Sequence, residues 1–203
     1  MKIVFLHGLG QTAQDWNAVV EQVSCLDTDC PELFSLDGKD ITYSNVFAQL
    51  ERRYGETAEP FVLCGLSLGA ILALDYAIQH GDQVSSLILI GAQYKVPSLL
   101  IDFQNVVFRC MPRKVFEEMG ISKNDIIKLS HSMRSLDFRS KLNEVRCPVT
   151  IVCGEKDHAN KKAAKKMNAL LPQSQLQIIP GAGHEINQCA PEAIATILNH
   201  QNG

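Results

Sequence analysis

Ser67 lies in a pentapeptide whose spacing suits a nucleophilic serine. The Gly-x-Ser-x-Gly motif at residues 65–69 follows a short apolar run that begins at Phe61, and a helix-favouring run of Leu, Ala and Ile comes directly after it. This pattern predicts a strand, a sharp turn and a helix, with the serine at the turn. Gly65 and Gly69 would let the strand and the helix approach each other, so the turn presents the Ser67 hydroxyl instead of packing it.

His184 and Asp157 are the residues best suited to activate Ser67. A serine hydroxyl is a weak nucleophile at neutral pH, so it needs a base, and the base needs a third group that holds its tautomer. Asp157 and His184 each follow a predicted strand, as Ser67 does. Because parallel strands present their carboxyl ends at one edge, we expect the three side chains to converge there. Weaker candidates for the base lie at helical segments, beside the acid or at the start of a glycine loop: His80, His131, His158 and His7.

Two backbone amides could stabilise the anion that forms when a serine attacks a carbonyl. The N–H of Leu68 follows the nucleophile at the start of a predicted helix, and the N–H of Leu9 lies in the glycine loop at residues 7–10. Helix amino ends and glycine loops bind anions through such groups. Losing one donor of this kind typically raises the reaction barrier by about 3 kcal/mol. We therefore predict an oxyanion hole built from the backbone of Leu9 and Leu68.

The elements that must position these residues alternate along the chain. Apolar runs predict buried strands, and amphipathic stretches between them predict helices, an order that favours an α/β fold with a parallel sheet and helices on both faces. The predicted strands cover residues 2–6, 33–36, 61–64, 86–90, 148–153 and 176–179, the second of them a short edge strand. The predicted helices cover about residues 12–23, 42–54, 68–79, 160–171 and the C-terminal segment. Between residues 93 and 145, apolar residues from Leu99 to Met119 recur at helical spacing, which predicts several short inserted helices.

The motifs together resemble those of the α/β-hydrolase superfamily, over essentially the whole chain. The resemblance rests on four points, namely His7-Gly8, the motif at residues 65–69, the Gly-Glu-Lys-Asp sequence at residues 154–157, and Gly183-His184. It implies Ser67 as nucleophile, Asp157 as acid, His184 as base, and the amides of Leu9 and Leu68 as oxyanion donors. In some members the acid follows the strand before the cap, but residues 91–94 here contain no carboxylate, which favours Asp157.

The resemblance also implies a fold. Members usually have two strands before the His-Gly strand, whereas this chain starts on it, so we expect a shortened, six-stranded, mostly parallel sheet in the order 2-1-3-4-5-6. The chain would form a single domain over residues 1–203, with a small helical cap inserted at about residues 95–145. The loop at residues 35–40 lacks the common Gly-His-Gly-x-Ser pattern, so the substrate class of members that carry it does not transfer.

These features predict a cofactor-free serine hydrolase that cleaves a small-molecule carboxylic ester or thioester through an acyl-enzyme on Ser67. The same residues could open a lactone, cleave a carbon–carbon bond or transfer an acyl group, because the fold and the triad are shared while the cap decides the substrate. A ligand-binding protein with little turnover is the alternative from another class. The apolar residues of the cap could line an acyl pocket or simply hold short helices on the sheet.

Composition agrees with an ordinary globular protein. The chain has 203 residues, 46% of them apolar, and a net charge of -3, which argues against a nucleic-acid surface. Its seven cysteines form no Cys-x-x-Cys pair, and neither a metal-ligand spacing nor a dinucleotide fingerprint is present, so no metal and no cofactor is predicted. The apolar run at residues 3–6 is too short for a signal peptide, and no run could span a membrane. We therefore expect a cytoplasmic protein without a membrane partner, of undetermined oligomeric state.

Overall fold

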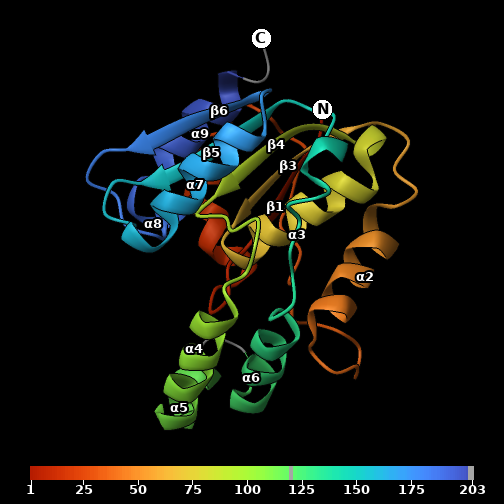
Figure 1. Cartoon of the computed structure of the whole chain (residues 1–203). Helices are drawn as coiled ribbons and strands as arrows, with labels where there is room; N and C mark the ends of the chain where they lie inside the picture. Colours follow the sequence, from red (N-terminus) through yellow and green to blue (C-terminus); the bar gives the residue numbers. More distant parts are fainter. Residues whose placement is uncertain (119–120, 201–203) are drawn as a thin grey trace.

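A six-stranded parallel sheet forms the centre of the chain in the computed structural model, which describes residues 1–118 and 121–200 (Figure 1). The strands are β1 (Ile3–Leu6), β2 (Thr28–Asp29), β3 (Phe61–Leu66), β4 (Val84–Ile90), β5 (Val149–Gly154) and β6 (Ser174–Ile179). Their order is β2-β1-β3-β4-β5-β6, and every pair is parallel. The predicted fold class and strand order are thus confirmed, and all carboxyl ends of the strands lie at one edge.

Helices cover both faces of the sheet, because successive strand residues point to opposite sides. Val4 and Leu6 belong to one buried cluster, and Ile3 and Phe5 belong to the other. The first cluster includes residues of α2 (Tyr43–Tyr54), α3 (Leu68–Gln79) and α7 (His158–Leu170). The second includes residues of η1 (Ala13–Trp16), α1 (Asn17–Val20), α8 (Ile186–Cys189) and α9 (Pro191–His200).

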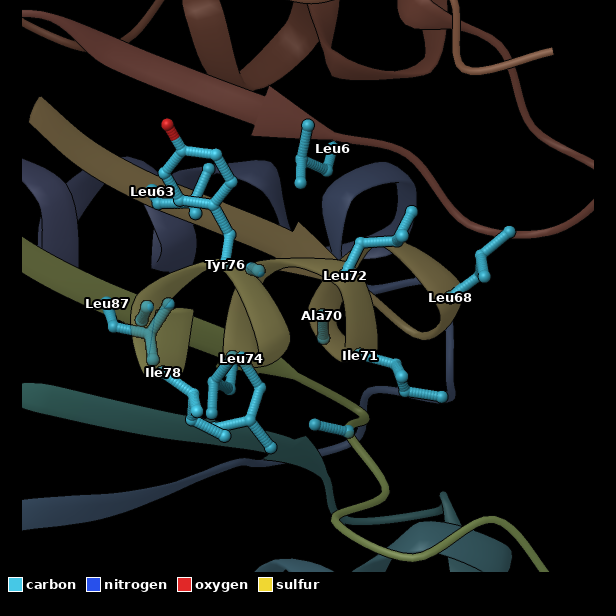
Figure 2. Packing of buried hydrophobic residues seen from close by; sticks show 14 of the residues in the cluster. Leu6, Leu63, Leu68, Ala70, Ile71, Leu72, Leu74, Tyr76, Ile78 and Leu87 are labelled. Carbon is cyan, nitrogen blue, oxygen red and sulfur yellow. The ribbon is translucent and has the colours of Figure 1, made fainter. Parts of the chain in front are cut away.

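The central helix α3 is apolar on all sides, as expected for a helix enclosed by other elements. Every residue from Leu68 to Ile78 is buried. Figure 2 shows Leu6, Leu63 and Leu87, which come from three different strands, arranged around this helix. The buried carboxylate of Asp75 accepts hydrogen bonds from the Tyr43 hydroxyl (2.9 Å) and from the Gln79 amide (2.8 Å). The helix that carries the predicted oxyanion donor Leu68 is therefore fixed on the sheet.

The second strand was predicted in the wrong place. We expected it at residues 33–36, but β2 lies at Thr28–Asp29, where it pairs with Ile3 and Val4 of β1. Leu33 and Leu36 are buried all the same. The Leu33 amide does not join a strand ladder because it donates to Nε2 of His7 (3.1 Å). The apolar pattern at residues 33–36 therefore reflects burial in a turn.

The predicted helix at residues 12–23 is also shorter than expected, because it consists of the 3₁₀ turn η1 followed by the single turn α1. Trp16 and Val19 are buried as the pattern indicated. The other predicted helices and strands occur within a few residues of their expected bounds, and a further 3₁₀ turn, η2 (Gly81–Gln83), precedes β4.

Three helices occupy the insertion between β4 and β5: α4 (Ser98–Cys110), α5 (Arg113–Glu118) and α6 (Lys123–Ser132), with the turn η3 (Leu142–Glu144) after them. We call α4, α5 and α6 the insertion helices, and Figure 1 shows them extending away from the sheet. The chain enters and leaves this segment as an antiparallel pair, with Val96 N donating to Leu136 O (3.0 Å) and Phe138 N donating to Tyr94 O (2.9 Å). Met119 and the side chain of Leu99, the ends of the predicted apolar pattern, lie outside the described parts of the chain.

The insertion helices have a small buried cluster of their own, formed by Phe116, Ile121 and Ile126. Within residues 1–118 and 121–200, no helix combines the length and the apolar character needed to cross a lipid bilayer.

Candidate active site

A pocket of about 350 Å³ lies between the carboxyl ends of the strands and the insertion helices. Four of the predicted site residues line it: Leu9, Ser67, Leu68 and His184. A larger depression, of about 550 Å³, is lined by residues just before β4 and β5, such as His80 and Glu144. Those positions lie at the amino ends of the strands, on the opposite edge of the sheet. The predicted residues therefore mark the smaller pocket as the candidate active site.

Ser67 occupies the strained turn that its motif predicts. Its φ of 53° and ψ of −109° lie in a region that residues other than glycine rarely adopt. A Cβ atom on Gly65 would overlap the carbonyl of Gly69, and one on Gly69 would overlap the carbonyl of Leu6. The Ser67 amide donates to the carbonyl oxygen of Ile90 at 2.8 Å. The two glycines are thus required by close backbone approach, and Ser67 stays partly exposed between buried neighbours.

His184 and Asp157, which lie 27 residues apart in the sequence, form a hydrogen bond of 2.7 Å between Nδ1 and Oδ2. A carboxylate only accepts, so the proton of a neutral His184 lies on Nδ1 and its Nε2 has a free lone pair. Two backbone hydrogen bonds join the acid turn to the loop before His184, from Glu155 N to Ile179 O (2.9 Å) and from Lys156 N to Ala182 O (2.9 Å). The imidazole is thereby prepared to accept a proton at Nε2.

Asp157 is held in its ionised form. Burial alone would raise its pKa, but hydrogen bonds from His184 and Asn160 outweigh that effect and bring the pKa below its ordinary value of 3.8. The side chain is 5% exposed, whereas that of His184 is 38% exposed. A buried carboxylate behind a solvent-accessible imidazole can stabilise the positive charge that the ring gains with a proton.

Asn160 is a residue of the site that sequence reasoning missed. Its Nδ2 donates to both carboxylate oxygens of Asp157, at 3.0 and 2.9 Å, and its Oδ1 accepts from Nε2 of Gln93 at 2.7 Å. Nδ2 also lies 3.2 Å from Nδ1 of His184, a proximity of two N–H groups, since Nδ1 already donates to Asp157. Gln93 belongs to the stretch that we interpreted only as lacking a carboxylate. The feature of the sequence that could have identified Asn160 is its position three residues after Asp157. At this spacing the Asp157 side chain caps α7 by accepting a hydrogen bond from the Asn160 backbone amide.

Gly91 lies directly against the imidazole of His184. A Cβ atom at this position would lie 2.7 Å from Cε1 and 2.9 Å from Nδ1 of His184, and the residue has a φ of +58°. Any side chain at residue 91 would therefore displace the ring. The sequence indicated only that this glycine ends a strand.

The two predicted oxyanion donors lie at the pocket. Among the residues that the structure describes, neither the Leu9 amide nor the Leu68 amide has a protein acceptor. Leu68 is the first residue of α3, whose dipole adds positive potential at that end. Both N–H groups are thus available to a negative charge formed beside Ser67.

The loop that carries Leu9 is fixed by hydrogen bonds of His7, one of the weaker candidates for the base. Its Nε2 accepts from the Leu33 amide (3.1 Å), so its proton lies on Nδ1, which donates to the Gly8 carbonyl (3.0 Å). Burial lowers the pKa of His7, more than the Gly8 carbonyl and Glu32 raise it. His7 is therefore neutral and has a structural role, and it is not a candidate for the catalytic base.

A buried amide pair joins this loop to the segment after His184. Gln11 and Asn187 exchange two hydrogen bonds of 3.3 Å, and Gln11 Oε1 also accepts from the Gly8 amide at 3.2 Å. Neither residue is more than 3% exposed. The loop of Leu9 is thus connected to α8, which begins two residues after His184.

The structure brings Ser67 and His184 to one pocket without joining them. Within the described residues, the Ser67 hydroxyl has no hydrogen-bond partner. Of the competing histidines, His80 pairs with Glu51 at 2.9 Å, and His131 and His158 are exposed. His184 is therefore the histidine that shares a pocket with Ser67.

Comparisons with known proteins agree with this architecture. The chain is 23% identical, over 97% of its length and 88% of the relative's, to a candidate 2-succinyl-6-hydroxy-2,4-cyclohexadiene-1-carboxylate synthase of Bacillus subtilis. It is also 23% identical, over 97% of its length and 89% of the relative's, to a candidate carbamate hydrolase, RutD, of Escherichia coli. The solved esterase EaEST of Exiguobacterium antarcticum has a similar fold, with a TM-score of 0.83 at 16% identity, covering 100% of this chain and 92% of that one.

A profile of the alpha/beta hydrolase family matches residues 3–197, nearly the whole chain and every predicted site residue. The chain belongs to the alpha/beta hydrolase family.

Proposed function

We propose that this protein is a serine hydrolase that cleaves an uncharged, small-molecule ester or thioester through an acyl-enzyme on Ser67. The observation that carries the proposal is the 2.7 Å hydrogen bond between His184 and Asp157 at the wall of the pocket that Ser67 also lines. Catalytic hydrogen bonds of ligand-free enzymes are often long and tighten in the substrate complex, so the unpaired Ser67 hydroxyl is compatible with the mechanism.

In the proposed reaction, Ser67 Oγ attacks the substrate carbonyl carbon while His184 Nε2 takes the hydroxyl proton. The amides of Leu9 and Leu68 stabilise the oxyanion. The tetrahedral intermediate expels the alcohol or thiol, which leaves with the proton from His184. Water then attacks the acyl-enzyme, giving its proton to His184, and the acid is released as Ser67 regains its hydrogen. Asp157 stays ionised throughout and stabilises the imidazolium.

The pocket lining supports a neutral substrate. The described residues that line it include no lysine and no arginine, and most of them are apolar. A carboxylate buried there would lose its hydration without gaining a cation. The Bacillus relative is named for a carboxylate product, so its reaction is a poorer fit to this pocket. The volume of about 350 Å³ is near the lower end for small-molecule sites and favours a modest acyl group.

A panel of p-nitrophenyl esters and thioesters of increasing chain length tests the proposal. We expect Ser67→Ala to lower kcat/KM at least about a thousandfold, because the nucleophile is lost. Ser140→Ala, which changes an exposed serine, is the matched control and should behave as the wild type. Wild-type turnover by the Ser67→Ala variant would refute the proposal. A carbamate belongs in the panel, since RutD is named for carbamate hydrolysis.

Covalent labelling separates a hydrolase from a binding protein with the same fold. A fluorophosphonate probe forms a phosphorus–oxygen bond with an activated serine and expels fluoride. We expect the wild type to be labelled at Ser67 and the His184→Ala variant to be labelled far more slowly. Absence of labelling in the wild type would favour a low-turnover binding role.

A further inference from the structure

Two insertion helices contribute matching stripes to the pocket. Ile101 and Phe108 of α4 line it, as do Ile126 and Ser130 of α6 and Met133, the residue directly after α6. Positions three and four apart share one face of a helix. The face of α6 therefore has a serine between two apolar residues, and the corresponding middle position on α4 is Asn105.

Both middle residues carry buried oxygens that lack partners. Ser130 is 1% exposed and Asn105 is 6% exposed. Among the residues that the structure describes, neither Oγ of Ser130 nor Oδ1 of Asn105 has a hydrogen-bond partner. Buried polar atoms are almost always paired, and leaving one unpaired is costly. Ser132, two residues further on α6, shows the usual outcome, because its Oγ donates to Leu129 O (2.7 Å) and accepts from Tyr43 N (2.8 Å). The unpaired hydroxyl thus occurs at the serine that lines the pocket.

We propose that Ser130 is a specificity residue whose hydroxyl binds an uncharged oxygen on the part of the substrate that enters the insertion helices. This inference rests on the proposed function, which places the substrate carbonyl at Ser67 in the same pocket. Ser130 Oγ is sealed from solvent in this structure, so it reaches the substrate by rotation between staggered rotamers of its side chain. Asn105, at the corresponding position of α4, is a second buried polar residue on the insertion helices.

The residues that line the pocket indicate which chemical group of the substrate Ser130 would bind. A keto, ether or hydroxyl oxygen accepts a hydrogen bond from Ser130 without bringing a charge into a pocket whose lining residues include no lysine or arginine. A plain alkyl group would leave the hydroxyl unpaired. The preferred substrate therefore has an oxygenated, neutral acyl group.

Isosteric pairs of p-nitrophenyl esters test this inference. Each pair has a ketone at C4, C5 or C6 of the acyl chain in one ester and a methyl branch at the same carbon in the other. We expect at least one pair to show a keto-over-methyl ratio of kcat/KM that falls about tenfold in Ser130→Ala. Ser132→Ala is the control, and its ratio should equal that of the wild type. Equal ratios for wild type and Ser130→Ala at all three positions would overturn the inference.

A binding measurement keeps this test separate from the chemistry. In the Ser67→Ala background, which the ester proposal predicts to be inactive, the dissociation constant of each ester is measured with and without Ser130→Ala. We expect the constant of the keto ester to rise about tenfold and that of its methyl isostere to change little. A uniform change in both would refute the role of Ser130 even if the esters are hydrolysed. A selective change would support it even if Ser67 proves inactive.

Discussion

Asn160 shows how much of the candidate site depends on one amide. It bridges Asp157 and Gln93, so it orients the acid from α7 and connects it to the loop after β4. The hydrogen bonds along Gln93, Asn160, Asp157 and His184 fix the orientation of each side-chain amide. Gln93 donates to Asn160, and both Asn160 and His184 donate to the Asp157 carboxylate. We therefore propose that Asn160 is a positioning residue that acts through Asp157.

We predict that Asn160→Ala lowers kcat/KM for a short ester about tenfold, because Asp157 loses two hydrogen bonds to its carboxylate. The pKa of Asp157 should rise, since those bonds contribute to lowering it. The measurements are steady-state kinetics and the acid limb of the pH profile. Asn168→Ala, on the same helix and bonded to Ser174, is the control. A variant with an unchanged kcat/KM would show that the Asn160 side chain is not needed to orient the acid.

At the scale of single residues, the sequence predicted the location of a side chain where that location follows from backbone position. Ser67 and His184 were brought together as predicted because each follows a strand. Gly91, Gln93 and Asn160 were missed because their importance depends on which side chain lies opposite them in space. Spacing along the chain does not contain that information.

At the scale of elements, the pocket depends on loops that are tied to each other. The amide pair of Gln11 and Asn187 connects the loop of the Leu9 donor with α8, which starts two residues after His184. Since Gln11 also binds the Gly8 amide, it fixes the backbone just before Leu9. The proposed base, His184, and one proposed oxyanion donor, the Leu9 amide, are therefore held by the same pair of buried amides.

We predict that Gln11→Ala lowers kcat for a short ester while KM changes little, because a displaced Leu9 amide affects the transition state more than the bound substrate. The free energy of unfolding should fall by about 1–3 kcal/mol, because the Asn187 amide and the Gly8 amide lose buried partners. A double-mutant cycle with Asn187→Ala, followed by urea unfolding, should show a coupling of at least about 0.5 kcal/mol. Additive effects would indicate that the pair is not a unit. Gln22→Ala, at an exposed glutamine, is the control.

The misplaced second strand shows the limit of pattern reading for elements. Leu33 and Leu36 are apolar and buried, as residues of a strand would be, but the Leu33 amide donates to His7 and does not pair with a strand. β2 has only two residues and no apolar side chain, so no periodicity could have revealed it. The order of the sheet was predicted correctly because it came from the resemblance to the α/β-hydrolase superfamily, which does not depend on the exact position of the second strand.

At the scale of the whole molecule, two buried groups make stability depend on pH. Burial lowers the pKa of His7 from 6.5, and hydrogen bonds lower the pKa of Asp157 from 3.8 in spite of burial. In both cases the unfolded chain binds a proton at a higher pH than the folded chain does. Stability is therefore present above the unfolded pKa and is lost as pH falls toward the folded pKa.

We predict that the free energy of unfolding decreases below about pH 6.5, where His7 of the unfolded chain becomes protonated, and decreases again below about pH 3.8 through Asp157. Each group contributes at most about 1.4 kcal/mol per pH unit. Urea unfolding between about pH 5 and pH 8 measures the first decrease. His7→Gln should flatten it, because the titrating group is gone, whereas His131→Gln, at an exposed position, should not. An unchanged slope in His7→Gln would mean that another group destabilises the fold in mild acid.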